Sequence, residues 1–286
     1  MLSGNSPEAR YVRNSISNVP RMINDVMDAP KDISITEQEK KKVKISVVLP
    51  VFNEAENVPL VASGIIEVLD KLNEAYEIIF VDDGSKDNSF EVLKGICSKY
   101  KVVRTIRFKK NCGETAALDA GFKAARGDWV VAMDADLQTD PNDIPKMLEK
   151  TKEYDVVWGY RDKRNDPWIK LISSKVANFV RNKLTNENIR DVGCPLRVIK
   201  KECLDKLKLF TGLHRFMPTL CKMEGYRVVE LEIKHSPRRY GKSKYNIWNR
   251  VFRSFVDLLA VRWMLKRRLG YEVVESTMVD NEVLPR

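Results

Sequence analysis

The sequence predicts an α/β fold, a parallel sheet with helices on both faces. Two observations lead to this prediction. Short apolar runs alternate along the chain with amphipathic segments of 10–15 residues or more, the pattern of repeated strand–helix units. Two of the apolar runs also end in acidic residues, as expected where the carboxyl ends of parallel strands form a ligand site. The 286 residues, of which 43% are hydrophobic, suffice for one large domain with appendages.

The predicted strands are apolar runs short enough to be buried in a parallel sheet. They cover residues 43–52, 76–85, 102–108, 128–136 and 154–161. The second run, YEIIFVDDGS, ends in two acids and a glycine turn, and the fourth, DWVVAMDAD, ends in two acids one residue apart.

The predicted helices cover residues 53–74, 86–100, 113–125 and 141–153. In the first, apolar residues recur on one face at Val58, Val61, Ile65 and Leu69. In the second, Asp87 or Asn88 is expected to cap the N-terminus. No G-x-G-x-x-G follows the first strand, so a dinucleotide cofactor is not expected.

Four segments are expected along the chain. Residues 1–42 form a polar, partly mobile arm, and residues 43–235 form the catalytic domain. Residues 236–270 form a basic loop and amphipathic helices, and residues 271–286 form a polar tail.

The positive charge of the chain is concentrated near its C-terminus. The net charge is +10, and residues 238–268 contain ten Lys or Arg against one acid, Asp257. Such a block indicates an anionic partner, either phosphates or an acidic membrane surface. Nucleic acid is the less favoured partner, because the aromatic residues there share a helical face with aliphatic ones and are not spaced for base stacking.

The composition argues against a zinc site, a disulfide framework and a membrane-spanning helix. The five cysteines have no metal-ligand spacing and there are only two histidines, so neither a zinc site nor a disulfide framework is expected. The apolar stretch at 254–265 contains Asp257 and Arg262 and is shorter than the roughly 20 residues of a membrane span.

Asp134 and Asp136 suggest a metal site. Side chains repeat every two residues in extended backbone, so these two carboxylates are expected to point the same way and to repel each other. A bound Mg²⁺ or Mn²⁺ that also contacts a diphosphate would offset the repulsion, and Gln138 could point to the same side. The alternative is a pair of loop acids that cap the helix at Pro141.

Seven motifs in the same order resemble a known family. They are SVVLPVFNEAENV, FVDDGSKDNS, GETAALDAGFKAARGDWVVAMDADLQTDP, YDVVWGYRDKR, DVGCPLRVIKK, HRFMP and HSPRRYGKSKY. Together, over about residues 43–265, the chain resembles a family 2 glycosyltransferase of the polyprenyl-phosphate branch, which contains dolichol-phosphate mannose synthase and undecaprenyl-phosphate sugar transferases.

The resemblance implies a GT-A fold, with a Rossmann-like sheet, and a set of site residues. Nucleotide-binding positions would be Pro50, Phe52, Glu54, Asp82 and Asp83, with Asp82 on the base and Asp83 shaping the turn. Phe52 stands where the family usually has tyrosine, so a hydroxyl contact is expected to be missing. Metal and diphosphate positions would be Asp134, Asp136 and Gln138. Asp191 would lie near the sugar, and phosphate-binding positions would be Arg161, Arg238, Ser243 and Lys244.

The resemblance also implies the reaction, an inverting, metal-dependent transfer. A hexose would move from a nucleotide-diphosphate sugar, of the GDP-mannose or UDP-glucose type, to a dolichyl or undecaprenyl phosphate. Independently of the family, a phosphate monoester is already ionised at neutral pH and needs cations rather than a general base. A glycan or protein hydroxyl acceptor would need a base. Asp191 is the candidate base in that case; otherwise it anchors the turn at Gly193 and Pro195.

The segment at 246–269 predicts a basic amphipathic helix. Its apolar stripe is Trp248, Val251, Phe252, Phe255 and Leu259. Such a helix is typical of a membrane interface, although packing on the domain's own core explains its first half equally well. We therefore expect peripheral contact with the cytosolic face of a membrane. Relatives often continue into membrane-spanning helices, whereas here a polar segment follows. The sequence leaves the oligomeric state open.

Overall fold

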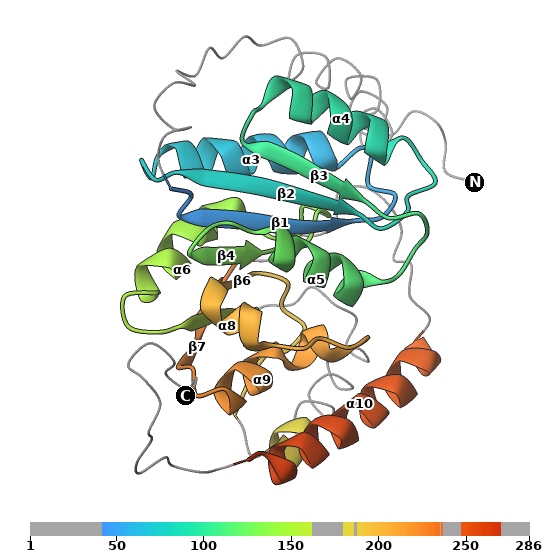
Figure 1. The fold of residues 1–286 in the computed structure, drawn as a ribbon, viewed down its shortest axis with the longest axis vertical. Helices are drawn as coiled ribbons and strands as arrows, with labels where there is room; N and C mark the ends of the chain where they lie inside the picture. The colour runs from blue at the N-terminus through green and yellow to red at the C-terminus, as the bar shows by residue number, and fades with distance from the viewer. Residues whose placement is uncertain (1–41, 162–179, 186–187, 235, 237–246, 270–286) are drawn as a thin grey trace, which may run out of the picture.

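A single seven-stranded sheet forms the centre of the molecule (Figure 1). The computed structural model describes residues 42–161, 180–185, 188–234, 236 and 247–269. The strand order is β3-β2-β1-β4-β6-β5-β7. The strands are β1 (Ile45–Val51), β2 (Tyr76–Asp82), β3 (Val103–Arg107), β4 (Trp129–Ala132), β5 (Val156–Tyr160), β6 (Arg197–Lys200) and β7 (Val228–Glu232). The predicted α/β class is confirmed.

The sheet is mostly parallel, with one reversed strand. β6 runs antiparallel to both β4 and β5, and all other neighbouring pairs are parallel. The sequence did not predict β6 or β7. β6 has only four residues and begins with Arg197, so it has no apolar run of strand length. β7 alternates apolar and acidic residues in VVELE and is half-buried rather than buried.

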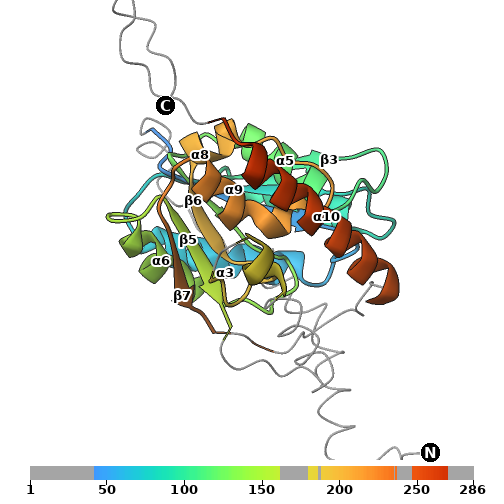
Figure 2. The ribbon, with the colours of Figure 1, turned by 90° about the horizontal axis from the view of Figure 1, so that it is seen from below.

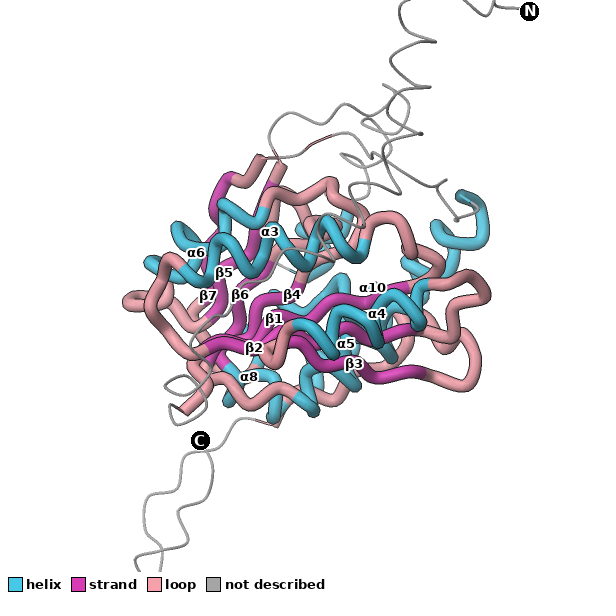
Figure 3. Tube along the Cα trace, turned by 90° about the horizontal axis from the view of Figure 1, so that it is seen from above, coloured by secondary structure: helices cyan, strands magenta, loops and turns pink. Residues whose placement is uncertain are grey.

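Helices cover both faces of the sheet. They are α3 (Val58–Asp70), α4 (Ser89–Lys99), α5 (Glu114–Ala124), α6 (Ile144–Lys150), α8 (Lys201–Lys206), α9 (Met217–Met223) and α10 (Ile247–Arg267), with 3₁₀ turns η1 (Pro141–Asp143) and η2 (Leu213–Phe216). α3 and α6 lie on one face of the sheet, and α5, α8 and α9 lie on the other (Figure 2). The view from the opposite side again shows α3 and α6 on one face and α5 and α8 on the other (Figure 3).

Several predicted boundaries move, and two of these shifts next to the carboxyl edge of the sheet bear on the site. The first helix begins at Val58 rather than at 53, because Asn53 has a left-handed φ of 53° and Pro59 favours a helix start there. β4 ends at Ala132 rather than at 136. The loop that follows contains Leu137 with a φ of 61°, a conformation that non-glycine residues rarely adopt. Asp134 and Asp136 therefore lie in a loop and not in extended strand.

The main core lies on both sides of the central strands. β1 and β2 are buried along almost their whole length, and the largest fully buried side chains include Trp158 and Phe80. This rigid centre holds the ends of β1, β2 and β4 in fixed positions.

A smaller hydrophobic cluster attaches α10 to the domain. It joins Leu213, Phe216 and Leu220 to Leu258 and Val261 of the helix. α10 therefore lies on the outside of the α5 side of the molecule (Figure 2). No helix in the described part of the chain is long and apolar enough to cross a membrane.

The described part of the predicted stripe is not the face of α10 that packs on the domain. Phe255 and Leu259 are about half exposed, whereas Leu258 and Val261 are buried. Trp248, Val251 and Phe252 lie outside the residues whose side chains are described. The predicted arm and tail, at 1–42 and 271–286, lie almost wholly outside the described residues.

Candidate active site

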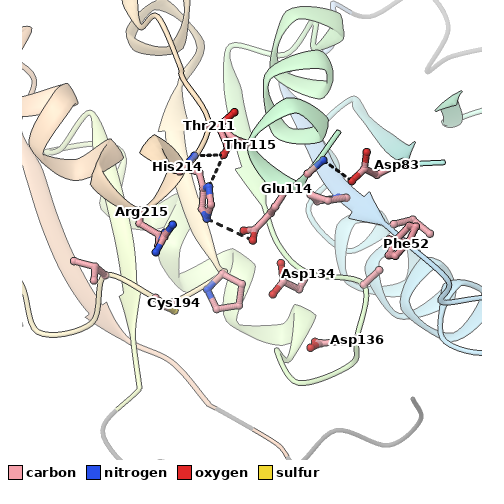
Figure 4. A pocket seen from close by; sticks show the side chains of 18 of the residues that line it. Phe52, Asp83, Glu114, Thr115, Asp134, Asp136, Cys194, Thr211, His214 and Arg215 are labelled. Atoms are coloured by element: carbon pink, nitrogen blue, oxygen red, sulfur yellow. Dashed lines mark hydrogen bonds and ion pairs between the residues drawn. The ribbon is translucent and has the colours of Figure 1, made fainter. Parts of the chain in front are cut away.

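A cavity of about 1260 Å³ lies at the carboxyl ends of β1, β2 and β4. Figure 4 shows side chains that line it. This is the edge at which open α/β sheets bind ligands. Seven of the predicted site residues line it: Pro50, Phe52, Glu54, Asp83, Asp134, Asp136 and Gln138.

The loop after β1 is held by the loop after β2. The Asn53 amide donates to the Ser85 hydroxyl at 2.9 Å, and the Lys86 amide donates to the Asn53 side-chain oxygen at 2.7 Å. These bonds explain why Asn53 keeps a left-handed conformation, since Asn tolerates it better than other side chains. They fix Phe52 and Glu54 in the cavity wall.

Asp82 and Asp83 take different positions. Asp83 lines the cavity and accepts hydrogen bonds from the amides of Cys112 (2.6 Å) and Gly113 (2.9 Å) just before α5. Burial raises the pKa of Asp83 despite these bonds. Asp82 is fully buried, accepts from the Ser85 amide and pairs with Arg107 at 3.3 Å. Only Asp83 belongs to the wall.

Asp134 and Asp136 both line the cavity, from the loop after β4. Asp136 accepts from the Gln138 amide at 3.1 Å, a turn that keeps its carboxylate beside the left-handed Leu137. The cap of the following 3₁₀ turn is Asp140, which accepts from the Asn142 amide at 2.9 Å. The capping role considered for the two acids thus belongs to Asp140.

The electrostatic surroundings of Asp134 are unfavourable for its charge. Burial, together with the negative charges of Glu114 and Asp136, raises the pKa of Asp134 to about 8, against the opposing effect of Arg197 and Arg161. Glu77, at the opposite (amino) edge of the sheet, has surroundings that favour its charge instead. Its side chain is also buried, but it is bonded to Ser46, Arg104 and Arg126, which hold the pKa of its carboxyl below its usual range although burial opposes them.

The cavity wall carries an excess of acidic groups. Among the described residues that line it, six are carboxylic acids and three are arginines. A diphosphate could enter such a wall only with a counter-cation, and a divalent ion needs only one or two carboxylates when phosphate supplies the rest. No cluster of three or more His, Cys, Asp or Glu is placed for metal binding within the described ranges. The pair Asp134 and Asp136 nevertheless fits a divalent cation shared with a phosphate ligand.

Arg197 lies at the floor of the cavity, and sequence reasoning gave it no role. It is 3% exposed, sits over the Trp158 ring at 5.0 Å, and its Nε has no hydrogen-bond partner. Burial lowers the pKa of its guanidinium, while Glu114 and Asp134 oppose the shift. A buried arginine at the start of a four-residue strand gives no sequence signal beyond its place at the end of the DVGCPLR motif.

A second group that sequence reasoning missed links α5 to η2. The Thr115 hydroxyl lies 2.7 Å from Nδ1 of His214 and accepts from the Gly212 amide at 2.9 Å. Nε2 of His214 lies 3.4 Å from the Glu114 carboxylate. The motifs GETAALD and HRFMP contained these residues, but only the fold brings positions about 100 residues apart together (Figure 4).

Arg161 and Asp191 form a buried ion pair that does not line the cavity. Nε of Arg161 lies 2.7 Å from Asp191 Oδ2 and Nη2 lies 3.1 Å from Oδ1. Asp191 also accepts from the Gly193 amide. These contacts are expected of a residue that anchors the turn at Gly193 and Pro195. Residues 192–195, which follow Asp191 directly, form part of the cavity wall.

Three predicted phosphate-binding residues, Arg238, Ser243 and Lys244, lie outside the described residues. Of the other predicted positions, seven line the cavity, whereas Asp82, Arg161 and Asp191 do not. Their individual roles remain predictions.

A protein-family model described as glycosyl transferase family 2 matches residues 46–208. An undecaprenyl-phosphate 4-deoxy-4-formamido-L-arabinose transferase from Proteus mirabilis is 38% identical over 205 residues, which are 71% of this chain and 63% of that protein. A protein of the same name from Serratia proteamaculans is 34% identical over 206 residues, again 71% of this chain and 63% of that protein. The chain thus spans less than two thirds of these relatives.

Solved structures share the fold at low identity. A mannosyltransferase from Pyrobaculum calidifontis, in complex with GDP-Man and Mn²⁺, has a TM-score of 0.57 at 18% identity, covering 92% of this chain and 74% of that one. Glucosyl-3-phosphoglycerate synthase from Mycobacterium tuberculosis, in complex with Mn²⁺, UDP and phosphoglyceric acid, has a TM-score of 0.59 at 18% identity, covering 85% of each chain.

Proposed function

Because the chain belongs to glycosyl transferase family 2, we propose that it transfers a sugar from a nucleotide-diphosphate sugar to a polyprenyl phosphate. Support for the acceptor comes from the relatives, which are named for undecaprenyl phosphate. The single observation that carries the proposal is the acid-rich cavity at the carboxyl edge of the sheet, which both Asp134 and Asp136 line and where the charge of Asp136 acts on Asp134.

The proposed reaction is a direct displacement. An oxygen of the acceptor phosphate attacks the anomeric carbon, a new carbon–oxygen bond forms, and the bond from that carbon to the diphosphate breaks with its electron pair leaving on the nucleoside diphosphate. Attack from the opposite face inverts the anomeric centre. No proton has to be removed from an ionised phosphate. This agrees with the position of Asp191, the acid predicted as the base for a hydroxyl acceptor, which is bonded to Arg161 and does not line the cavity.

Mg²⁺ or Mn²⁺ is the proposed cofactor, and when bound it would neutralise charge on the departing diphosphate. Asp134, Asp136 and Gln138 would hold it, while the loop after β1 and Asp83 would bind the nucleoside. We also propose that the phosphate groups are contacted by Arg161, Arg238, Ser243 and Lys244.

The donor sugar is the least constrained part of the proposal. A hexose is the first candidate, of the GDP-mannose or UDP-glucose type. The relatives are named for a modified arabinose, so an amino-pentose donor is the second candidate.

We further propose that the protein works at the cytosolic face of a membrane, bound peripherally through 236–270. α10 supports this part of the proposal. One face packs on the catalytic domain, while Phe255, Leu259 and Trp263 remain exposed on the other. Arg253, Lys266 and Arg267 are exposed on the same helix, which suits anionic lipid.

Transfer of radiolabel tests the proposed function. Purified protein receives labelled UDP- and GDP-sugars with Mn²⁺, and either undecaprenyl phosphate, undecaprenol or a soluble glycan. We expect label in an organic-extractable product only with the phosphate. Label recovered only with a hydroxyl acceptor would overturn the proposal in favour of the same fold acting on a glycan or protein.

A further inference from the structure

Hydrogen bonds connect one end of the cavity, where Phe52 and Asp83 lie, to η2 through the first turn of α5 (Figure 4). Asp83 accepts from the two backbone amides that directly precede α5, at 2.6 and 2.9 Å. Within the first turn of α5, the Thr115 hydroxyl lies 2.7 Å from Nδ1 of His214 and accepts from the Gly212 amide at 2.9 Å. The start of α5 is thus attached on one side to Asp83 and on the other side to η2.

η2 is in turn attached to α10. The Arg215 guanidinium lies 3.6 Å from the Asp257 carboxylate and also donates to the Ser254 hydroxyl. The same Asp257 carboxylate packs against Gly212, in the space that a Cβ would occupy. Gly212 has a φ of +92°, so no other residue would fit this approach without strain. Gly212 therefore contacts α10 with one side and donates to Thr115 with its amide.

The attachment of α10 is small and separate from the main core. Among its described side chains, at residues 253–267, only Leu258 and Val261 are buried. Both belong to the smaller cluster with η2 and α9, not to the cluster around the sheet. An element with few buried apolar contacts opens at a lower free energy than the core. We therefore expect α10 to undock and redock while the sheet stays folded.

We propose that nucleotide binding and docking of α10 on η2 are coupled through the contacts of Thr115 with His214 and Gly212. This inference rests on the proposed function, because it takes a nucleoside diphosphate as the ligand of the cavity. A docked α10 fixes η2, η2 fixes the first turn of α5, and that turn holds Asp83. Coupling between two sites is reciprocal, so a nucleotide that binds more tightly when α10 is docked must also favour docking.

The three elements of this connection all belong to the cavity wall. They contribute Glu114 and Thr115 from α5, His214 and Arg215 from η2, and Arg253, Val256 and Asp257 from α10. When α10 undocks, its part of the wall leaves and η2 loses its contacts with Asp257 and Ser254. The undocked state therefore offers a nucleotide an incomplete site, and this difference between the two states is what coupling requires.

The coupling would link the nucleotide to the helix that we propose for membrane contact. Leu259 and Trp263 lie on α10 and are 46% and 64% exposed, on the side away from the domain. A bound nucleotide would hold α10 on the domain with these side chains facing outward.

Hydrogen exchange of α10, with and without nucleotide, tests the coupling. The full chain is measured with Mn²⁺ alone and with Mn²⁺ plus saturating UDP or GDP. Without nucleotide, the amides of residues 253–267 should exchange faster than those of β1 and β2, which report global unfolding. With nucleotide, their exchange should slow at least about fivefold, the lower end of typical coupling.

Two variants of Thr115 test the connection itself. Thr115→Val removes the hydroxyl and keeps the shape of the side chain, whereas Thr115→Ser keeps the hydroxyl. The slowing of α10 exchange by nucleotide should fall below about twofold in Thr115→Val and persist in Thr115→Ser. A purely structural role of Thr115 would speed exchange in both states and leave their ratio unchanged.

The reciprocal effect is measured as the Kd of the nucleotide with Mn²⁺, by calorimetry. The double variant Leu258→Ala with Val261→Ala removes the two buried side chains of α10, neither of which lines the cavity. It should weaken nucleotide binding at least about fivefold, and should weaken it no further in a Thr115→Val background. Val103→Ala, a buried valine at the amino end of β3, is the control and should leave the Kd within about twofold.

Four results would overturn the inference. Unchanged α10 exchange in a wild type that binds nucleotide refutes the coupling and leaves the proposed function intact. Exchange of α10 no faster than that of β1 refutes separate undocking, and equal slowing in Thr115→Val and Thr115→Ser refutes the connection. A wild type that binds neither UDP nor GDP with Mn²⁺ refutes the proposed donor site and this inference together.

Discussion

At the scale of single residues, the acids at the two edges of the sheet differ in the charge of their neighbours. Glu77, at the amino edge, is neutralised by Arg104 and Arg126. Asp134, at the carboxyl edge, has Glu114 and Asp136 as its strongest charged neighbours. The first arrangement stabilises the fold, and the second leaves an unfavourable charge that a ligand cation can relieve.

The raised pKa of Asp134 predicts how stability depends on pH. Between the ordinary Asp value of 3.8 and about 8, the native state keeps a proton on Asp134 that the unfolded chain has lost. Its contribution to the free energy of unfolding therefore falls as pH rises through this window. Asp134→Asn removes that contribution, so the variant should be more stable than the wild type at pH 8 and closer to it at pH 5.

Denaturant unfolding in EDTA at both pH values measures this difference. Asp140→Asn, from the same loop but outside the cavity wall, is the control and should show no such pH-dependent gain. A wild type more stable than Asp134→Asn at pH 8 would contradict the assigned shift.

The variant Asp191→Asn distinguishes two possible roles of Asp191, anchoring the turn at Gly193 and acting as a catalytic base. Removing the charge leaves Arg161, 14% exposed, with a weakened partner, which should lower the free energy of unfolding by about 3 kcal/mol. The folded enzyme should keep its kcat on a phosphate acceptor within tenfold.

Asp155→Asn is the matched control for this substitution, because its partner Arg227 is largely exposed. Its cost should stay near 0.5 kcal/mol or less, roughly the value of a surface pair. A loss of kcat of a hundredfold or more in Asp191→Asn, without a loss of stability, would assign Asp191 as a base instead.

At the scale of secondary-structure elements, α10 is amphipathic in an unusual way. Leu258 and Val261 pack on η2 and α9, while Phe255, Leu259 and Trp263 face outward. A helix with apolar residues on two faces is expected where one face meets protein and another meets lipid.

Vesicle binding tests the outer face. The double variant Leu259→Ala with Trp263→Ala should bind anionic vesicles at least tenfold more weakly, since burying each side chain contributes roughly 1.5–3 kcal/mol. Phe210→Ala is the control, because Phe210 is 65% exposed but lies outside α10. Equal binding of the double variant and the control would refute membrane contact through this face.

The sequence predicted well those strands whose two faces are both buried. β1 and β2 are apolar runs, and their hydrophobic residues alone define them. It missed β6, because a four-residue strand that starts with Arg197 is stabilised by pairing with β4 and β5, not by its own apolar content. It left open whether the stripe of α10 meets lipid or the core, because periodicity identifies an apolar stripe but not what covers it.

At the scale of the whole molecule, the cavity collects residues from distant parts of the chain. Asp83 and Asp134 follow parallel strands, and the rule that ligands bind at this edge was enough to predict that they would meet. His214 and Arg215 come from a 3₁₀ turn, and Asp257 comes from α10. Their approach depends on tertiary packing that no local pattern contains.

The central claim is that Asp134 and Asp136 hold a divalent cation together with a nucleoside diphosphate. The most direct measurement is the thermal midpoint with UDP or GDP, with and without Mn²⁺, for the wild type, Asp136→Ala and the loop control Asp140→Ala. For one of the nucleotides at about 100 times its Kd, binding should stabilise the wild type and Asp140→Ala by roughly 2.7 kcal/mol, and only with Mn²⁺. Asp136→Ala should remain folded and lose the Mn²⁺-dependent rise. An undiminished rise in Asp136→Ala, or unfolding of that variant without ligand, would contradict the account.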